Sequence, residues 1–255
     1  MYPSQWHRIY GDQTGESARR ILLPLLERFD VSSMVEVGCG HGHWSRVALE
    51  HGIDEILAID GPWNEQSKLL IDAGNYREAD LGQPLDLGRR FDLAVCLEVA
   101  EHVAAEGAGN LVASLVKAAD VILFGAAIPM QGGHGHINEQ WPSYWRALFE
   151  PHGYEPFDLV RPVHWEDREV HYWYRQNAFV YVNRAAPLAI ERAGLGASGG
   201  DLVPSTRGLL APMDAVHPEK YEEVASYKSI AFKRLARNFP AWAARRLKSK
   251  LTGEG

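Results

Sequence analysis

The chain of 255 residues has a formal net charge of −7, with 46% hydrophobic and 23% charged residues. These are ordinary globular values, so the chain can bury a sizeable core and needs no disulfide staples. No apolar run reaches the roughly 18 residues of a membrane span, and the first residues contain no apolar signal core. The two cysteines, Cys39 and Cys96, lie in apolar, strand-like runs. We therefore expect reduced thiols and a cytoplasmic location.

The charge is unevenly distributed along the chain. Residues 228–255 contain eight Lys or Arg and one acidic residue, a net charge of +7, whereas the remainder carries −14. Apolar residues interleave with these basic residues in an amphipathic helical pattern. We expect this basic tail to pack on the acidic body or on a second subunit, which would give a homodimer. A membrane surface or a nucleic acid is the alternative partner, and the acidic body argues against nucleic acid.

The first half of the chain alternates short apolar runs with helical patterns. Apolar, β-branched runs predict strands over residues 34–37, 56–59, 76–79, 91–97 and 121–124. Helical spacing predicts helices over residues 44–51 and 111–119. Such alternation predicts an α/β fold with a doubly wound, mostly parallel sheet that helices cover on both faces.

The pattern changes after the fifth predicted strand. Residues 131–140 are rich in Gly and His and predict a loop, and residues 141–150 predict a short helix with aromatic side chains. Residues 154–160 and 177–182 alternate or run apolar. We expect these two segments to form an antiparallel pair at the edge of the sheet.

The same patterns suggest how the chain is divided. We expect an N-terminal helical cap over residues 1–29 and one domain over residues 30–195. Residues 196–218 are mostly rich in Gly, Pro and Ser, which predicts a linker. Residues 219–255, the basic helical tail, are interrupted at Pro240.

Glycines and acidic residues follow the first three predicted strands. Gly38, Gly40 and Gly42 follow the first strand, and glycine lets backbone approach a ligand closely. Asp60 ends the second strand, 20 residues after Gly40, where a carboxylate can accept two hydrogen bonds from a ribose. Asp80 ends the third strand, where it can accept an adenine amino group. Each feature alone suits a tight turn with a capping acid, but the three together favour a site for an adenosine-containing cofactor.

The glycine spacing does not match a dinucleotide site. The G-x-G-x-x-G pattern needs a third glycine at position 43, where this chain has His43. Glu36 lies two residues before Gly38 and would repel a pyrophosphate. Its carboxylate could instead hydrogen-bond near the ammonium group of an amino acid.

Four segments carry a resemblance to a known family. VEVGCGHGHW, ILAIDGPW, YREADL and FDLAVCLEVAEHV resemble motifs I to IV of class I S-adenosylmethionine-dependent methyltransferases. The resemblance covers roughly residues 30–185 and implies a Rossmann-like fold with S-adenosylmethionine as cofactor. By analogy, Gly38 and Gly40 would face the methionine part, Asp60 the ribose, and Asp80 with Leu81 the adenine. The other expected cofactor contacts are Glu36, Cys39, Gly61, Trp63 and Glu98, with Trp63 either stacked on adenine or packed on the surface.

Methyl transfer to a hydroxyl needs an aligned acceptor and a group that removes or masks its proton. Glu98, Glu101 and His102 follow the fourth predicted strand and would share one face if the segment were helical. His134 and His136 would point the same way in an extended loop. One hypothesis is a divalent ion, Mg²⁺ or similar, held by Glu98, Glu101, His102 and His136. The other is a general base among His102, His134 and His136.

The E-x-x-E-H run with later histidines resembles metal-dependent O-methyltransferases, including those of ubiquinone biosynthesis and of small-RNA 3′ ends. Many methyltransferases carry Glu-His here without a metal. In that interpretation Glu98 contacts the cofactor, Glu101 is solvated, and His102 is a capping or substrate-side residue.

Residues 132–145 and 161–177 are dense in aromatic and hydrogen-bonding side chains. Such residues suit a sugar, cyclitol or polyphenolic ring, or they simply cover the sheet edge. The expected substrate contacts are Asn138, Trp141, Tyr172 and Arg175. We therefore predict methyl transfer to a hydroxyl of a small polyhydroxylated or saccharide-like natural product. The alternatives are a small-molecule N-methyltransferase, a metal-dependent RNA 2′-O-methyltransferase, and a non-enzymatic partner subunit that binds the adenosine cofactor.

Overall fold

The computed structural model describes residues 4–194 and 213–225, with side chains described from residue 13 onwards. The chain divides into two compact units, residues 1–215 and 216–255. The described part of the second unit is α8 (Pro218–Ala225). The predicted linker (196–218) and basic tail (219–255) lie for most of their length outside the described residues, so the homodimer expected from that tail stays a prediction.

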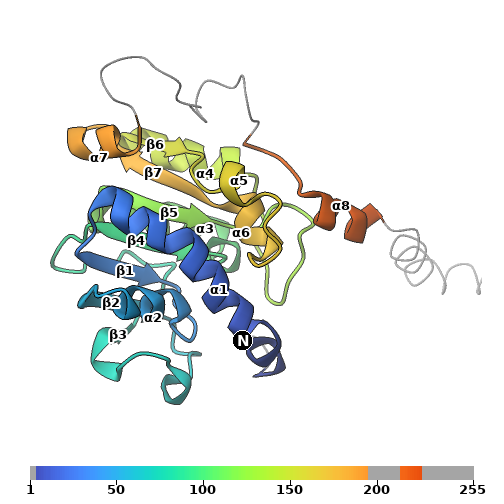
Figure 1. Cartoon of the computed structure of the whole chain (residues 1–255), viewed down its shortest axis with the longest axis horizontal. Helices are drawn as coiled ribbons and strands as arrows, with labels where there is room; N and C mark the ends of the chain where they lie inside the picture. The colour runs from blue at the N-terminus through green and yellow to red at the C-terminus, as the bar shows by residue number, and fades with distance from the viewer. Residues whose placement is uncertain (1–3, 195–212, 226–255) are drawn as a thin grey trace, which may run out of the picture. The chain divides into compact units, whose positions relative to one another are not determined.

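The first unit is built on a seven-stranded sheet with the order β3-β2-β1-β4-β5-β7-β6 (Figure 1). Five strands are parallel: β1 (Ser33–Val37), β2 (Glu55–Asp60), β3 (Tyr76–Glu78), β4 (Leu93–Leu97) and β5 (Val121–Gly125). At one edge β7 (Phe179–Asn183) pairs antiparallel with β5, and β6 (Tyr154–Phe157) pairs antiparallel with β7. The predicted mostly parallel sheet with an antiparallel edge is confirmed.

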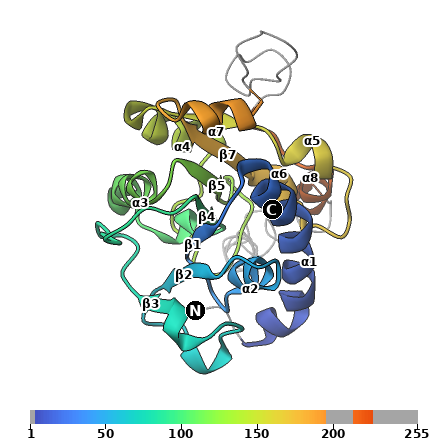
Figure 2. The same ribbon diagram turned by 60° about the vertical axis from the view of Figure 1, so that its left-hand side comes forward.

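Helices cover both faces of this sheet (Figure 2). On one face, α1 (Ser4–Phe29) and α2 (His43–Glu50) share a hydrophobic core with Leu93 and Val95 of β4. On the other face, α3 (Ala105–Ala118) and α4 (Pro142–Phe149) pack with Ala94 and Cys96 of the same strand. Successive residues of a strand point to opposite faces, so a fully buried strand such as β4 reads as a continuous apolar run.

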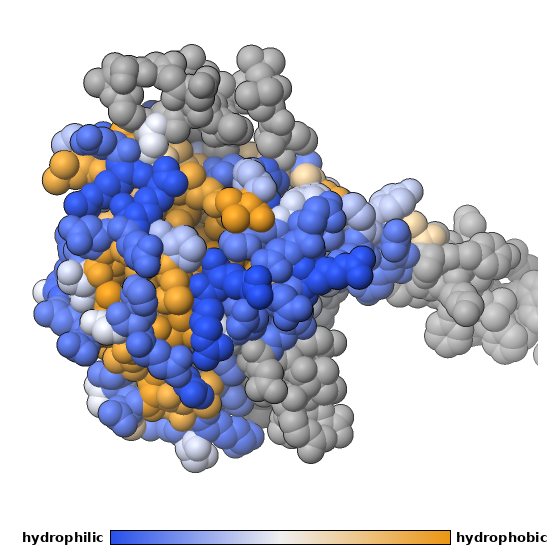
Figure 3. Space-filling view, in the orientation of Figure 1, coloured by the Kyte–Doolittle hydropathy of each residue, from blue (hydrophilic) through white to orange (hydrophobic). Residues whose placement is uncertain are grey.

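Short helices complete the described fold: α5 (Arg161–His164), α6 (Tyr172–Asn177) and α7 (Pro187–Arg192), with 3-10 turns at Gln66–Lys68, Ala73–Asn75, Ala100–His102 and Glu150–His152. Hydrophilic residues extend across the face that α1 covers (Figure 3). There Arg20 pairs with Glu16 and Asp167. None of the described helices has both the length and the apolar composition of a membrane span.

The predicted strands are all present, and most of the differences lie at their ends. The strand predicted over residues 154–160 ends at Phe157, because the acidic Asp158 turns to pair with Arg161. Helix α3 begins at Ala105 rather than at residue 111, since its first turn consists of small residues and one acid, without apolar periodicity. The pattern gave no helix over residues 161–177, where the structure has α5 and α6.

The strand order places a crevice at one end of the sheet. From β1 the chain moves outward to β2 and β3 and then returns to β4 on the other side of β1. Ligands of doubly wound sheets bind at such a switch point, beyond the carboxyl ends of the strands.

Candidate functional site

A cavity of about 1390 Å³ opens at this switch point. Its lining combines residues that follow the parallel strands, the loop over residues 131–137, and aromatic residues of α6. The residues expected at the site from sequence that line the cavity are Glu36, Gly38, Cys39, Gly40, Asp60, Trp63, Asp80, Leu81, Glu98, His102, His134, His136 and Tyr172.

The turn after β1 brings bare backbone to the cavity. Gly38 has φ +80°, and a Cβ there would lie 2.2 Å from the Val99 side chain. Only glycine combines this positive φ with so close a neighbour. The turn is held to β2, since the Gly38 and Cys39 amides both donate to the Ile59 carbonyl, at 2.7 and 3.0 Å.

Asp60, at the end of β2, joins this turn to the next one. Its carboxylate accepts hydrogen bonds from the Gly40 amide at 2.6 Å and the Gly61 amide at 2.7 Å. Burial raises the Asp60 pKa, and the two backbone amides and the Trp63 side chain oppose that shift. Trp63 lies against Gly61, where a Cβ would meet its ring at 2.2 Å, yet half of the indole is exposed. The absence of a side chain at Gly61 therefore leaves room for the Trp63 ring, which lines the cavity.

Two further acids take part in local hydrogen bonds. Asp80 accepts the Gly82 amide at 2.9 Å in a tight turn beside the buried Leu81. Glu36 is buried in β1, and its Oε2 accepts the Ser45 amide at 2.8 Å and hydroxyl at 2.5 Å. Burial raises the Glu36 pKa to about 8, although the Ser45 hydrogen bonds lower it. Both acids line the cavity, so the hydrogen bonds that hold them also help to set its shape.

Glu98 does not share a helical face with Glu101 and His102, contrary to the sequence expectation. Its backbone has φ +56°, and only Ala100–His102 forms a 3-10 turn. The Glu98 carboxylate instead accepts Gln131 Nε2 at 2.7 Å and Asn177 Nδ2 at 2.9 Å. Burial raises the Glu98 pKa to about 7 against these two hydrogen bonds.

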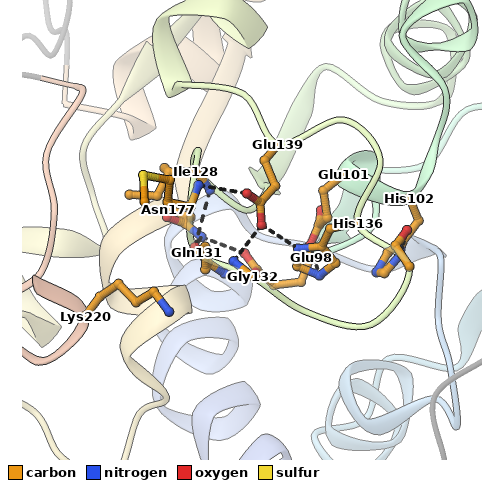
Figure 4. A network of polar contacts seen from close by, with 12 residues as sticks. Glu98, Glu101, His102, Ile128, Gln131, Gly132, His136, Glu139, Asn177 and Lys220 are labelled. Carbon is orange, nitrogen blue, oxygen red and sulfur yellow. Dashed lines mark hydrogen bonds and ion pairs between the residues drawn. The ribbon is translucent and has the colours of Figure 1, made fainter. Parts of the chain in front are cut away.

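Glu101, His102 and His136 lie together beside the cavity (Figure 4). One possible ligand atom from each lies within 4.8 Å of the others, and within the described residues this is the one such group of three or more. The His136 Nε2 lies 3.8 Å from Glu101 Oε1, and the imidazole rings of His102 and His136 meet edge to face at 4.8 Å. Glu98 is not in this group, although it belonged to the predicted metal set.

The electrostatics of this cluster are unusual. Glu101 is fully buried, and neither carboxylate oxygen has a well-formed hydrogen bond from the residues described. Burial, and next the charge of Glu98, hold the pKa of Glu101 well above its usual range, with minor opposition from the nearby amides of Glu101 and Ala127. Burial, and next His136, lower the His102 pKa to about 4. Two imidazoles and a buried carboxylate form a donor set that fits a divalent cation.

Comparisons with known proteins show similarity to methyltransferases over part of the chain. The sequence matches a family model described as a methyltransferase domain over residues 10–111. That segment contains β1 to β4 and the cofactor-side turns described above. Residues 10–111 therefore match a methyltransferase domain, and the sheet has the Rossmann-like fold of solved methyltransferases.

Individual proteins resemble parts of this chain. A ubiquinone biosynthesis O-methyltransferase of Cereibacter sphaeroides is 33% identical over 112 residues, which are 41% of this chain and 43% of that protein. The match thus spans less than half of this curated relative. The crystal structure of DesVI of Streptomyces venezuelae has a TM-score of 0.53 at 16% identity, covering 70% of this chain and 95% of that one. The sugar N-methyltransferase KedS8 of Streptoalloteichus sp. has a TM-score of 0.56 at 17% identity, covering 72% and 93%. These structural similarities concern the fold.

Three of the four expected substrate contacts of the methyltransferase do not line the cavity. Arg175 is buried and donates to the Trp165 carbonyl at 2.9 Å. Asn138 is buried and accepts Gln140 Nε2 at 3.0 Å, and Trp141 immediately precedes α4. Among the histidines, His134 lines the cavity but lies outside the three-residue cluster.

Sequence reasoning placed Glu139 and Asn177 in the substrate-side segments and gave no role to Gln131. In the structure, Gln131 and Asn177 donate to Glu98, and Glu139 contacts His136. A polar residue at the end of a predicted strand could have indicated such a role, and Asn177 is the first residue of the strand predicted over residues 177–182. This position resembles the signal that marked Asp60 and Asp80.

Proposed function

We propose that this methyltransferase transfers the methyl group of S-adenosylmethionine to a hydroxyl of a small polyhydroxylated or saccharide-like molecule. The observation that carries the proposal is the cluster beside the cavity, where a buried carboxylate without a well-formed hydrogen bond meets two imidazoles. A hydroxyl is a poor nucleophile until its proton is masked or removed, and such a cluster serves that purpose.

The cofactor half of the cavity fits S-adenosylmethionine. The Gly38 turn brings bare backbone to the cavity, as needed where a methionine moiety approaches the backbone, and Val99 occupies the place that a Gly38 side chain would need. Asp60 retains carboxylate lone pairs for a ribose diol after accepting two backbone amides, because each oxygen can accept more than one hydrogen bond. Asp80 and Leu81 supply a polar and an apolar group on the lining, as an adenine requires.

The size of the cavity supports a second ligand beside the cofactor. Its volume of about 1390 Å³ exceeds the range of about 300–1,000 Å³ that is typical of sites for one small molecule. The lining on the side of the histidine cluster includes Tyr172 and Trp173 of α6. Aromatic faces combined with hydrogen-bonding groups suit a ring that carries hydroxyls.

We propose a divalent ion as the group that masks the acceptor proton. Glu101, His102 and His136 would hold it and leave coordination positions for acceptor oxygens. When bound, such an ion lowers the pKa of a coordinated hydroxyl. Two imidazoles and one carboxylate suit Mn²⁺, Co²⁺ or Zn²⁺ better than Mg²⁺, which prefers oxygen ligands. Glu101 supplies the charge that partly neutralises the cation in this buried place.

A general base is the second candidate for the same step. Burial lowers the His102 pKa to about 4, so its imidazole is neutral at physiological pH but a weak base. A neutral imidazole accepts the acceptor's proton as the oxygen attacks the methyl carbon, and the sulfonium leaves as a neutral sulfide. His136 Nε2 is the other candidate acceptor. Both schemes place the acceptor hydroxyl at the cluster, in line with the methyl–sulfur bond.

The choice between oxygen and nitrogen as acceptor rests on the same cluster. An amine needs only to lose its ammonium proton near neutral pH, whereas a hydroxyl needs a much larger pKa change. An amine does not need a buried carboxylate such as Glu101 beside two imidazoles to lose its proton, whereas activation of a hydroxyl does. N-methylation of a small amine, the class of reaction named for KedS8, is the alternative.

The test has two stages. Calorimetry with S-adenosylhomocysteine checks the cofactor site, and absence of binding would overturn the proposal. Transfer from labelled S-adenosylmethionine is then measured on matched acceptors that differ only by hydroxyl or amine, with and without a chelator. We expect methylation of the hydroxyl, its loss in chelator, and recovery on adding Mn²⁺. Transfer to oxygen that persists in chelator would favour the general base, and transfer to the amine alone would refute O-methylation.

A further inference from the structure

Glu139 lies in the loop between β5 and α4 and contacts the histidine cluster from outside the cavity. Its Oε1 accepts the Gly132 amide at 2.6 Å and lies 3.0 Å from His136 Nδ1. Its Oε2 accepts the Met130 amide at 2.8 Å. Figure 4 shows the Glu139 carboxylate on one side of His136 and the cluster on the other. The carboxylate is thus anchored by backbone before it contacts the imidazole.

We infer that Glu139 is a positioning residue, which fixes His136 in the Nδ1–H tautomer and so directs the Nε2 lone pair toward Glu101. A carboxylate only accepts hydrogen bonds, so the ring nitrogen facing it must carry the proton. With the proton on Nδ1, the ring lone pair resides on Nε2, which lies 3.8 Å from Glu101 Oε1, beyond hydrogen-bond distance. That nitrogen is the one able to bind a cation or accept a substrate proton. The expected effect on catalysis rests on the proposed function, whereas the assigned tautomer rests on the geometry alone.

The loop also restricts the ring from its opposite edge. A Cβ on Gly133 would lie 2.2 Å from His136 Nε2, so this position must be glycine for the ring to keep its place. The His136 side chain is 7% exposed. With Glu139 at one nitrogen and Gly133 at the other edge, the loop permits one orientation of the imidazole.

The same loop also contacts His102. Its Nδ1 lies 3.2 Å from the Gly135 carbonyl, an acceptor that also requires the proton on Nδ1. Both imidazoles of the cluster therefore have their Nδ1 atoms opposite oxygen acceptors. A ligating or catalytic histidine is commonly held in this way, by an acceptor on the far nitrogen, and loss of that acceptor typically costs 10–100-fold in metal affinity or activity.

The test compares the full chain with Glu139→Gln, using Glu150→Gln, an exposed residue of the 3-10 turn after α4, as the matched control. Long-range ¹H–¹⁵N NMR on metal-free, ¹⁵N-histidine-labelled protein reads which ring nitrogen of His136 is protonated. We expect Nδ1–H in the parent and in Glu150→Gln, and partial or full transfer to Nε2–H in Glu139→Gln. Retention of Nδ1–H in Glu139→Gln would overturn the inference.

Calorimetry with MnCl₂ alone provides the second readout. We expect Mn²⁺ affinity to fall 10–100-fold in Glu139→Gln while S-adenosylhomocysteine affinity is unchanged, and kcat to fall with little change in KM. If the parent binds no Mn²⁺ and transfers no methyl group, the proposed function fails, while the NMR result still decides the tautomer. Should Glu139→Gln fold poorly, Gly133→Ala displaces the ring from the other edge. Gly133→Ala with an unmoved His136 resonance would equally contradict the inference.

Discussion

Glu98 and Glu101 are three residues apart, yet their carboxylates meet different partners: Glu98 binds two side-chain amides, and Glu101 faces the imidazole of His136. The positive φ of Glu98 ends β4 abruptly, and its amide donates to the Gly125 carbonyl at 2.8 Å. One carboxylate is therefore satisfied by the fold, and the other is available for chemistry.

This difference predicts opposite stability changes in a matched pair of variants. Glu98→Met leaves the buried amides of Gln131 and Asn177 without their acceptor and should cost about 1–3 kcal/mol of unfolding free energy. Glu101→Met removes a buried carboxylate that has no well-formed hydrogen bond, so stability should stay level or rise by about 1–2 kcal/mol. Urea unfolding in chelator measures both, and an equal loss in the two variants would contradict the assigned roles.

Stability should also depend on pH through Glu98. Burial raises its folded-state pKa to about 7 from a reference of 4.5, so the folded protein binds this proton more tightly than the unfolded chain. The resulting stabilisation is complete below pH 4.5 and is lost as the pH rises through 7, at most about 1.4 kcal/mol per pH unit. Glu98→Gln should flatten the stability curve between pH 4.5 and 7. A curve of unchanged slope would show that Glu98 is not the group that titrates.

Asp60→Asn tests the cofactor half of the site. We expect S-adenosylhomocysteine to bind about 10–100-fold more weakly, because an amide offers one acceptor oxygen where the carboxylate offers two charged ones. Asp54→Asn changes an exposed acid just before β2 and should leave the affinity unchanged. Isothermal calorimetry decides, and equal affinities for both variants would remove Asp60 from the cofactor site.

Gly38→Ala should disrupt the turn after β1. The new Cβ would lie 2.2 Å from Val99 at a φ of +80°, so we expect a loss of about 1–3 kcal/mol in stability and failure to bind S-adenosylhomocysteine. Gly74→Ala is the matched control, because a Cβ there meets nothing within 4 Å. Thermal unfolding of both variants, with and without the ligand, provides the measurement.

The sequence was sufficient for features carried by neighbouring residues. Gly38 follows one apolar run and Asp60 ends the next, as expected at the carboxyl ends of parallel strands, and both line the cavity. The prediction that Glu98 shares a face with Glu101 and His102 was wrong because it assumed a helix. In the structure the Glu98 carboxylate accepts a hydrogen bond from Asn177, a residue 79 positions away. Arg175 was expected at the substrate because its segment is dense in aromatic and hydrogen-bonding side chains, but its guanidinium donates to the Trp165 carbonyl. Such orientations depend on tertiary contacts that no local pattern records.

The hydrogen bonds of Glu98 have a consequence for exchanging parts between relatives. Glu98 lies within residues 10–111, which match the family model, whereas its partners Gln131 and Asn177 belong to the later half, which we propose forms the acceptor side. In a chimera whose second half comes from a relative, the buried Glu98 would lose its hydrogen bonds unless that half also carried Gln131 and Asn177. The two halves must therefore be inherited, or engineered, as one unit at these three positions.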